Sequence, residues 1–374
     1  MLVCEHCKGH HGEAHRYCPT TGKILAPWRF YPNGKIIGDR YRLGHSLGAG
    51  GMGAVFFATE IASGRPVAIK LMLPELSKDR EMVERMTREA QAARTVEHPN
   101  IAAVLDLGRA DDGALYLVVE FLEGDTLSDL ISRAGRLALP RAVNLARQML
   151  RGLSAVHARG IVHRDLKPEN LMVVSDAQGA EQVKLLDFGI AKSIDEDTKM
   201  RLTSSGVILG TPHYMAPEQA RCMRQVDGRA DVYGVAAVLY KMLTGRRAVD
   251  GPNYTTIVEQ ILKGRIVAPS KHVSSLTPEV DQVILRGLAR DRDQRYASAE
   301  QFEAALAAIC CPDDDVAARS VGFGADEDEA STVDRQVPTA STNQLAMLGS
   351  IAGVVLALLL IGCAVAWVLF VPRV

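Results

Sequence analysis

The chain contains 374 residues, of which 47% are hydrophobic and 23% are charged, and its formal net charge is −1. This length and hydrophobic content are enough for a large folded domain with appended segments. A net charge so close to zero excludes the strongly basic character typical of nucleic-acid-binding proteins, and we predict no nucleic-acid partner.

The first segment, residues 1–25, is a head rich in cysteine and histidine. Two pairs of its side chains have the spacing of zinc ligands: Cys4 and Cys7, then His15 and Cys18. The second pair resembles one knuckle of a zinc ribbon, with Thr21 where a fourth cysteine is usual and His15 as its substitute. We predict Zn²⁺ binding by these four side chains. The alternative is a disordered leader that carries thiols.

Residues 26–40 are predicted to be a linker, and residues 41–73 form strand-like runs around a glycine cluster. Glycines let a backbone approach phosphate groups closely and offer N–H groups to them. Tight turns between strands also collect glycine, so the cluster alone is weak evidence. The next strand, however, carries Val-Ala-Ile-Lys. The side chains and glycines of these two motifs are Leu47, Gly48, Gly50, Gly53, Val55, Ala68 and Lys70.

Residues 77–96 have the apolar period of an amphipathic helix, with Met86, Glu89 and Ala93 on one face. A hairpin is predicted next, around Asp111-Asp112-Gly113. After Gly124 the pattern becomes mostly helical. Helices are predicted from Pro140 to Gly160, at 230–243, from Pro278 with Thr277 as its cap, and at 298–309.

Residues 161–189 carry the densest set of reactive side chains. The run Ile-Val-His-Arg-Asp-Leu-Lys-Pro-Glu-Asn is followed, after a turn, by Lys-Leu-Leu-Asp-Phe-Gly. Phosphoryl transfer from ATP needs a group that accepts the hydroxyl proton, oxygen ligands for magnesium and a cation beside the phosphate. The side chains that can supply these groups are Asp165, Lys167, Asn170 and Asp187.

In this order and spacing, the motifs resemble the catalytic core of the eukaryotic-like (Hanks-type) protein kinases, and Lys167-Pro168-Glu169 is the serine/threonine form. The resemblance covers residues 41–309. It implies an α+β bilobal fold, in which a small β-rich lobe with one helix precedes a larger helical lobe. It also implies ATP and Mg²⁺, with Mn²⁺ as an alternative ion, and protein substrates.

The resemblance also implies a role for each residue. Asp165 would position the substrate hydroxyl and accept its proton, and Lys167 would neutralise the moving phosphate. Asn170 and Asp187 would hold magnesium. Lys70 would pair with the α- and β-phosphates and with Glu89, although Glu89 could instead be a solvated acid. The glycine loop would cover the phosphates, and adenine would meet the backbone of Glu120 and Leu122.

Regulation is implied by Arg164, which precedes the catalytic aspartate and in the family faces a phosphorylated residue of the activation segment. Thr203 and Ser205 are the predicted phosphorylation sites, with a flexible polar loop as the alternative, and Thr211 would contact the catalytic residues. Two structural contacts are also expected: a pair between Glu218 and Arg295, and support of the catalytic loop by Asp231.

Residues 310–343 are acidic and poor in apolar side chains, so we predict a disordered linker. Residues 345–370 carry no charge and are long enough to cross a bilayer. Gly349 and Gly353 give a small-residue stripe that could pair two such helices as a homodimer, although membrane helices also tolerate glycine generally.

The cysteines are not spaced as a disulfide framework and no signal peptide opens the chain. We therefore expect a single-pass protein of the cell (inner) membrane with its catalytic domain in the cytoplasm. The interpretation is a membrane-anchored bacterial serine/threonine protein kinase that autophosphorylates. Two alternatives are a pseudokinase scaffold and a zinc-dependent redox sensor. The intact catalytic residues argue against the scaffold.

Overall fold

The computed structural model describes residues 2–3, 10–11, 31–50, 53–72, 77, 80–176, 178–187, 212–221, 223 and 226–310. Several predicted features lie outside these residues: the zinc ligands Cys4, Cys7, His15 and Cys18, the sites Thr203, Ser205 and Thr211, the acidic segment from residue 311 on, and the uncharged run at 345–370. Within the described part of the chain, no helix has the length and apolar character needed to cross a membrane. In the head, β1 (Leu2–Val3) pairs antiparallel with β2 (His10–His11).

The β-rich lobe contains a six-stranded sheet with the strand order β3-β4-β5-β6-β8-β7, and each neighbouring pair is antiparallel. Glycine at position 113 has φ +84°, a left-handed conformation that closes the β7–β8 hairpin without strain and confirms the predicted turn. The strands are β3 (Ile36–Ile37), β4 (Tyr41–Gly50), β5 (Gly53–Glu60), β6 (Pro66–Met72), β7 (Val104–Arg109) and β8 (Leu115–Glu120).

Strand β8 lies inside this sheet and is buried on both faces. Leu115 and Leu117 belong to the hydrophobic cluster that also contains α1, whereas Tyr116 and Val118 belong to a second cluster formed by the other face of the sheet. Successive side chains of a strand point to opposite faces, so this alternation divides β8 between two cores. The continuous apolar run of β8 follows from this double burial.

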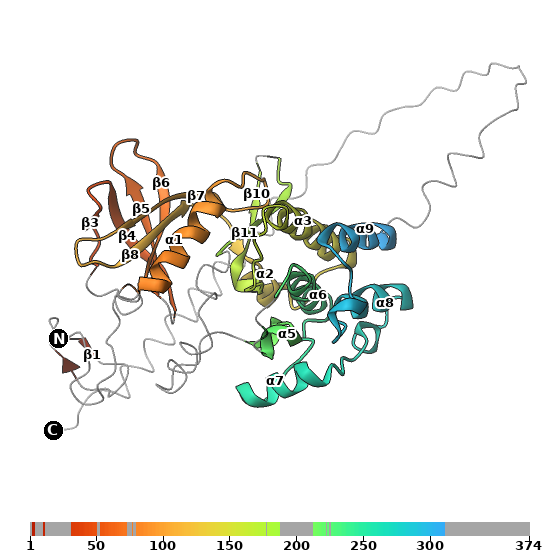
Figure 1. Cartoon of the computed structure of the whole chain (residues 1–374). Helices are drawn as coiled ribbons and strands as arrows, with labels where there is room; N and C mark the ends of the chain where they lie inside the picture. The colour runs from red at the N-terminus through yellow and green to blue at the C-terminus, as the bar shows by residue number, and fades with distance from the viewer. Residues whose placement is uncertain are drawn as a thin grey trace, which may run out of the picture. The chain divides into compact units, whose positions relative to one another are not determined.

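Helix α1 (Arg80–Arg94) lies against the sheet (Figure 1) and is shorter at both ends than the predicted 77–96. Met86, Ala90 and Ala93 are buried, and they share the cluster of Leu115 and Leu117. The predicted apolar face of this helix is therefore the face that packs. Glu89 lies on the same helix and is half-buried.

Residues 31–40 are folded onto the β-rich lobe, although the sequence suggested a linker over 26–40. Strand β3 extends the sheet by pairing with β4, and Ile37 is buried. Tyr31 is also buried, and its hydroxyl donates to the Asp112 carboxylate at 2.6 Å. A two-residue strand leaves too short an apolar pattern to be recognised in the sequence.

The helical lobe is built around α3 (Leu139–His157) and α6 (Arg229–Thr244), which pack on each other. Pro140 stands in the first turn of α3, where its missing N–H costs nothing, and confirms the predicted start. α6 is buried on nearly all sides and ends at Gly245, which takes the left-handed conformation with φ +70°. The helices predicted at both places are confirmed, with small differences at their ends.

Further helices complete this lobe, and their ends differ in how free backbone groups are satisfied. α7 begins at Asn253, whose side chain accepts from Thr256 N, and ends at the left-handed Gly264. α8 begins after Thr277 as predicted, but the Thr277 side chain accepts no backbone N–H there. These elements are α2 (Leu127–Ala134), α5 (Pro217–Ala220), α7 (Tyr254–Lys263), α8 (Pro278–Gly287) and α9 (Ala299–Cys310).

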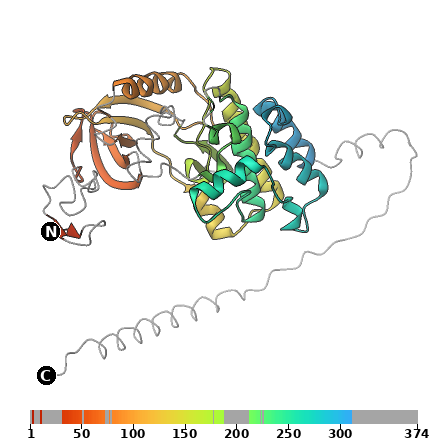
Figure 2. The same cartoon turned by 60° about the horizontal axis from the view of Figure 1, so that its bottom comes forward.

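A small three-stranded sheet stands between the two lobes, in the order β11-β10-β9. Its strands are β9 (Asp125–Thr126), β10 (Leu171–Ser175) and β11 (Glu181–Leu185). Leu185 connects the lobes, because its carbonyl accepts from Ala102 N at 3.0 Å and Ile101 bridges to it in parallel. Figures 1 and 2 show this sheet beside the β-rich lobe, and the predicted bilobal order is confirmed.

Candidate active site

The glycine loop joins β4 and β5, which pair from Tyr41–Glu60 to Gly50–Gly53. A side chain at position 53 would meet the Leu71 carbonyl oxygen at 1.9 Å, so β6 itself requires glycine there. At position 48, by contrast, a Cβ would meet nothing within 4 Å. No packing contact among the described residues therefore requires glycine at position 48. This agrees with a loop whose backbone approaches a ligand.

Lys70 lies on β6 opposite Val55 and Leu117, and its Nζ forms an ion pair with Asp187 Oδ2 at 2.8 Å. This contact brings together the lysine and the aspartate of two motifs far apart in the sequence. Asp187 follows β11 and has a left-handed backbone with φ +52°, which is rare outside glycine. Such conformations persist where the surrounding structure holds them, and they are frequent at active sites.

Glu89 was the predicted partner of Lys70, and the ion pair that the structure shows for Lys70 is with Asp187. Glu89 is half-buried on α1, so it is not the fully solvated acid of the alternative interpretation. Its pairing with Lys70 stays a prediction.

The predicted adenine site follows β8. Glu120 N donates to Ala103 O at 2.9 Å, which leaves its carbonyl oxygen as the backbone group that could accept from an adenine amine. The Glu120 side chain also contacts Ala103: its Oε1 accepts from Ala103 N and from Lys184 Nζ, at 2.9 and 2.8 Å. Leu122 is half-buried two residues on. The contact with Lys184 was not predicted from the sequence.

Two side chains of the catalytic loop, those of Lys167 and Asn170, converge on one carboxylate oxygen of Asp165. Lys167 Nζ lies 3.0 Å from Asp165 Oδ2, and Asn170 Nδ2 donates to the same oxygen at 2.9 Å. Asn170 Nδ2 also donates to the Asp165 carbonyl oxygen at 2.9 Å. The Asn170 amide nitrogen makes both contacts with Asp165, so the Asn170 side-chain oxygen takes part in neither.

The ends of the catalytic loop and of β11 are joined directly. Leu186 N donates to Asn170 O at 2.9 Å, and the buried His163 contacts Leu186 O through Nε2 at 2.9 Å. Asp187 follows Leu186 in the chain, so this hydrogen bond holds Asp187 close to Asn170. Sequence reasoning included His163 in the motif but assigned it no role, because a histidine beside a catalytic aspartate gives no sign of its partner.

Asp231 supports the catalytic loop from α6, as predicted. Its carboxylate is buried and accepts from His163 N at 2.8 Å and from Arg164 N at 2.9 Å. His157 Nε2 lies 2.7 Å from the same carboxylate and was not predicted from the sequence. Gly234, one turn along α6, leaves room for Leu166, since a Cβ there would approach the Leu166 Cβ at 2.9 Å.

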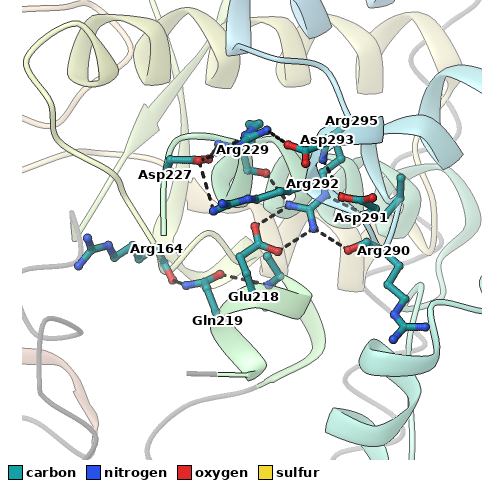
Figure 3. Close-up of polar contacts among 12 residues, drawn as sticks. Arg164, Glu218, Gln219, Asp227, Arg229, Arg290, Asp291, Arg292, Asp293 and Arg295 are labelled. Carbon is teal, nitrogen blue, oxygen red and sulfur yellow. Dashed lines mark hydrogen bonds and ion pairs between the residues drawn. The ribbon is translucent and has the colours of Figure 1, made fainter. Parts of the chain in front are cut away.

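The predicted pair of Glu218 and Arg295 is also confirmed. Both side chains are buried, and two parallel hydrogen bonds of 2.7 Å join them (Figure 3). The remaining donors of Arg295 reach backbone carbonyls, including Ala289 O at 2.8 Å and Arg229 O at 2.9 Å. A buried charge pair with its other groups satisfied fixes the position of α5 on the helical lobe.

Arg164 has a left-handed backbone with φ +61°. Its carbonyl oxygen accepts from Gln219 Nε2 at 2.9 Å, and its side chain points away from the Glu218–Arg295 pair (Figure 3). Its buried Nε has no hydrogen-bond partner among the residues that the structure describes. A buried guanidinium donor of this kind suits an anion, the role predicted from the sequence, whereas Thr203 and Ser205 lie outside the described residues.

The donor set of the site suits magnesium. The Asn170 amide oxygen and the Asp187 carboxylate are hard oxygen ligands, and Mg²⁺ usually takes one or two such groups from the protein and the rest from phosphates and water. Where the structure describes side chains, no group of three or more His, Cys, Asp or Glu could hold a metal. Asn170 and Asp187 stay the predicted magnesium ligands.

The comparisons with known proteins agree with this geometry. The family model described as "Protein kinase domain" matches residues 41–306. The chain is 39% identical over 279 residues to Serine/threonine-protein kinase pkn3 of Myxococcus xanthus, an alignment that covers 74% of this chain and 51% of pkn3. It is 38% identical over 273 residues to PknB of Mycolicibacterium smegmatis, with 72% and 43% covered. The chain therefore spans about half the length of the curated relatives it matches.

Solved structures give the same result for the fold. The crystal structure of a double mutant of the Mycobacterium tuberculosis PknI kinase domain superposes with a TM-score of 0.60 at 25% sequence identity. The superposition covers 75% of this chain and 99% of that domain. The crystal structure of the PknI kinase domain gives a TM-score of 0.58 at 26% identity, covering 74% and 98%.

Proposed function

This chain belongs to the protein kinase domain family, and we propose that it transfers the γ-phosphoryl group of ATP to serine and threonine hydroxyls of proteins. The observation that carries the proposal is the carboxylate of Asp165, held between Lys167 at 3.0 Å and Asn170 at 2.9 Å. The names of the relatives, which are serine/threonine-protein kinases, support the same substrate class.

In this mechanism Asp165 hydrogen-bonds the substrate hydroxyl and accepts its proton as the oxygen attacks the γ-phosphorus. The bond from that phosphorus to the leaving oxygen breaks, and ADP departs. Lys167 lies next to Asp165 and offers a positive charge to the phosphoryl oxygens during the transfer. Lys70 orients the α- and β-phosphates from β6. Positioning and charge therefore supply most of the acceleration.

Asn170 and Asp187 would hold Mg²⁺. The bound ion supplies neutralising charge to the phosphate oxygens. Asp187 meets Lys70 at 2.8 Å, so the carboxylate and the ammonium group are already close enough to share one set of phosphates. The hydrogen bond from Leu186 N to Asn170 O keeps the two ligand residues together.

Autophosphorylation of the activation segment is part of the proposal. The buried Nε of Arg164, which has no partner in the described part of the chain, supports a phosphate as its partner. The predicted acceptors are Thr203 and Ser205, and Thr211 is the predicted contact of the catalytic residues. A phosphate carries roughly two negative charges and accepts several hydrogen bonds, so it can order a loop around a guanidinium.

The remaining parts of the proposal rest on sequence. The uncharged run at 345–370 supports a single-pass anchor in the inner membrane, with the catalytic domain in the cytoplasm and helix pairing through Gly349 and Gly353. The spacing of Cys4, Cys7, His15 and Cys18 supports a Zn²⁺ site. Metal analysis of the full chain, compared with a Cys4→Ser/Cys7→Ser variant, tests the zinc site directly.

The kinase proposal is tested by mass spectrometry of the full chain after incubation with Mg-ATP, beside an Asp165→Asn variant. We expect new phosphate groups on Thr203 or Ser205 in the wild type. The variant should lose about 10²–10⁴-fold in rate, the usual contribution of a catalytic base.

Equal labelling of the two proteins would contradict the role of Asp165. If neither protein gains phosphate but both bind ATP, the chain acts as a nucleotide-binding scaffold rather than as an enzyme. Nucleotide binding is therefore measured on the same samples, so that an unfolded variant is distinguished from an inactive one.

A further inference from the structure

A cavity of about 620 Å³ lies on the helical lobe, beside the catalytic loop. Its walls come from α2, from the residues after Lys167, from the end of α6 and from the loop that precedes α7. Figure 1 shows α2, α6 and α7 gathered on this side of the lobe. Pro168 and Glu169 line the cavity and directly follow Lys167 in the chain, so the cavity adjoins the proposed site of phosphoryl transfer.

The charge of this cavity is unbalanced. Its lining contains two carboxylates, Glu169 and Asp250. Against them stand four basic side chains, and His272 adds an imidazole ring. The cations are Lys241, Arg246, Arg247 and Arg265.

Asp250 is already used within the protein. Its Oδ1 lies 3.0 Å from His213 Nε2 and 3.5 Å from Arg247 Nη1, and it accepts from Gly251 N at 2.9 Å. Arg247 in turn meets His213 Nε2 at 3.0 Å. Asp250 and Arg247 therefore neutralise each other at one side of the cavity.

The other three cations form no ion pair with a carboxylate in the part of the chain that the structure describes, although Lys241 lies near the charges of Asp250 and Glu169. Lys241 Nζ donates to the Gly245 carbonyl oxygen. Within the described residues, Arg246 and Arg265 form no ion pair, and both are exposed. Glu169 is exposed as well and forms no ion pair there. Three cations thus face one unpaired acid in a cavity next to the catalytic loop.

We propose that this cavity, here called the basic pocket, binds an acidic side chain of the protein substrate and makes the enzyme select serine and threonine residues near Asp or Glu. This inference deepens the proposed function and rests on it. Guanidinium groups suit carboxylates because their planar donors match the two oxygens. Cations already in place around a cavity attract an anion without reorganisation, and wrong partners such as Lys or Arg are repelled.

The distance from the pocket to Asp165 limits where the acidic residue can stand. Glu169 is four residues from Asp165, and four fully extended residues span at most about 14 Å. A substrate held in extended form covers the same distance with about four residues. We therefore expect the acidic residue within about four positions of the phosphorylated hydroxyl.

The chain's own sequence provides a probe. Residues 322–333 contain four acids, Asp326, Glu327, Asp328 and Glu329, just before Ser331 and Thr332. We would compare this peptide with a version in which the four acids are replaced by Asn and Gln, and with one in which they are replaced by Lys. Phosphorylation by the full chain gives kcat/KM for each peptide, and fluorescence anisotropy without ATP gives its Kd.

We expect the acidic peptide to exceed the amide peptide about tenfold in kcat/KM and in affinity, which corresponds to about 1.4 kcal/mol. Arg246→Gln/Arg265→Gln should bring that ratio close to one, and Arg246→Glu/Arg265→Glu should favour the lysine peptide. Arg42→Gln/Arg65→Gln, two exposed arginines of the β-rich lobe, is the control and should keep the wild-type ratio. The preference should also weaken as salt is raised.

Equal values for the acidic and amide peptides, or a wild-type ratio in Arg246→Gln/Arg265→Gln, would overturn the basic pocket. The binding measurement is independent of catalysis. A full chain that transfers phosphate to no substrate would contradict the proposed function, while the ratio of Kd values would still decide whether the pocket selects acids.

Discussion

Gln219 donates a hydrogen bond from its side-chain amide to the backbone carbonyl oxygen of Arg164, at 2.9 Å. Its own side-chain oxygen accepts from Ala216 N at 3.1 Å, so the amide cannot rotate without losing both bonds. Its neighbour Glu218 is held by Arg295. The short helix α5 thus connects the catalytic loop to the buried ion pair of the helical lobe.

Gln219→Ala should lower kcat about tenfold with little effect on the KM for ATP. The variant removes the donor that fixes the Arg164 carbonyl, one residue before Asp165, and small displacements of a catalytic base cost rate. Stability should fall by about 1–2 kcal/mol, because two hydrogen bonds of about 1 kcal/mol each or less are lost. Steady-state kinetics and urea unfolding of the full chain measure the two effects.

The matched control is Gln301→Ala. Gln301 is exposed on α9 and accepts one backbone hydrogen bond, from Ala297 N at 3.1 Å. Its loss should cost similar stability and leave kcat unchanged. If both variants lost kcat to the same extent, the effect of Gln219 would be a general loss of stability rather than a loss of positioning.

Arg295→Ala should destabilise the helical lobe by roughly 3–5 kcal/mol, because it leaves the Glu218 carboxylate buried and unpaired. Arg295→Lys should recover only part of this loss, since an ammonium group cannot form two parallel hydrogen bonds to one carboxylate. Glu218→Gln combined with Arg295→Met, which removes both charges, should be more stable than Arg295→Ala. Urea unfolding of the four proteins gives the order, and equal stability of Arg295→Lys and the wild type would contradict it.

His98 should make the protein less stable in acid. Its pKa lies below the ordinary value of 6.5 because of burial and the nearby charges of Arg151 and Lys184. The unfolded chain therefore binds more protons in this window, so the contribution of His98 is complete above about pH 6.5 and is lost as the pH falls through the lower folded pKa. Protonation also opposes the hydrogen bond from Asn100 N to His98 Nδ1.

His98→Asn should keep this hydrogen bond, because an asparagine oxygen can accept from the N–H two residues on, and it does not titrate. Since His98 is partly solvated, the effect should be only a few tenths of a kcal/mol between pH 7 and 5.5. The measurement is the free energy of unfolding in urea at both pH values. A variant whose stability falls as steeply as that of the wild type would place the acid sensitivity elsewhere, and His213 is the next candidate because its pKa is lowered too.

The sequence was sufficient where a motif is contiguous. Asp165, Lys167 and Asn170 lie within six residues, and the local backbone brings them onto one carboxylate oxygen. Contacts over long separations were harder. The pair of Glu218 and Arg295 followed from the family resemblance, whereas the ion pair of Lys70 with Asp187 was not predicted. This ion pair depends on the relative placement of β6 and β11, and no local pattern encodes it.

Other contacts could not be recognised from any pattern in the sequence. The strand β3 is too short for a period, and Gln219 looks like any exposed polar residue near a helix start. Lys184 is one of the 43 Lys and Arg residues of the chain, and nothing near it indicates an ion pair with Glu120. Such residues are found only when the strands that carry them are placed side by side.

Lys184→Met should raise the KM for ATP several-fold and lower stability by about 1 kcal/mol. Lys184 Nζ lies 2.8 Å from Glu120 Oε1, and both side chains are largely buried, with 14% and 21% of their area exposed. Removing the cation leaves the Glu120 carboxylate with the Ala103 N–H as its described partner, at the residue whose backbone borders the proposed adenine site. Lys184→Arg keeps the charge and should be close to the wild type.

Glu120→Gln removes the opposite charge, and the double variant Lys184→Met/Glu120→Gln removes both. If the pair acts as a unit, the double variant should be less impaired than the sum of the single variants, with a coupling free energy of about 1 kcal/mol. The KM for ATP and the free energy of unfolding are measured for all four members of the cycle. Strict additivity would mean that Lys184 acts through its contact with the Ile101 carbonyl oxygen at 3.5 Å and not through Glu120.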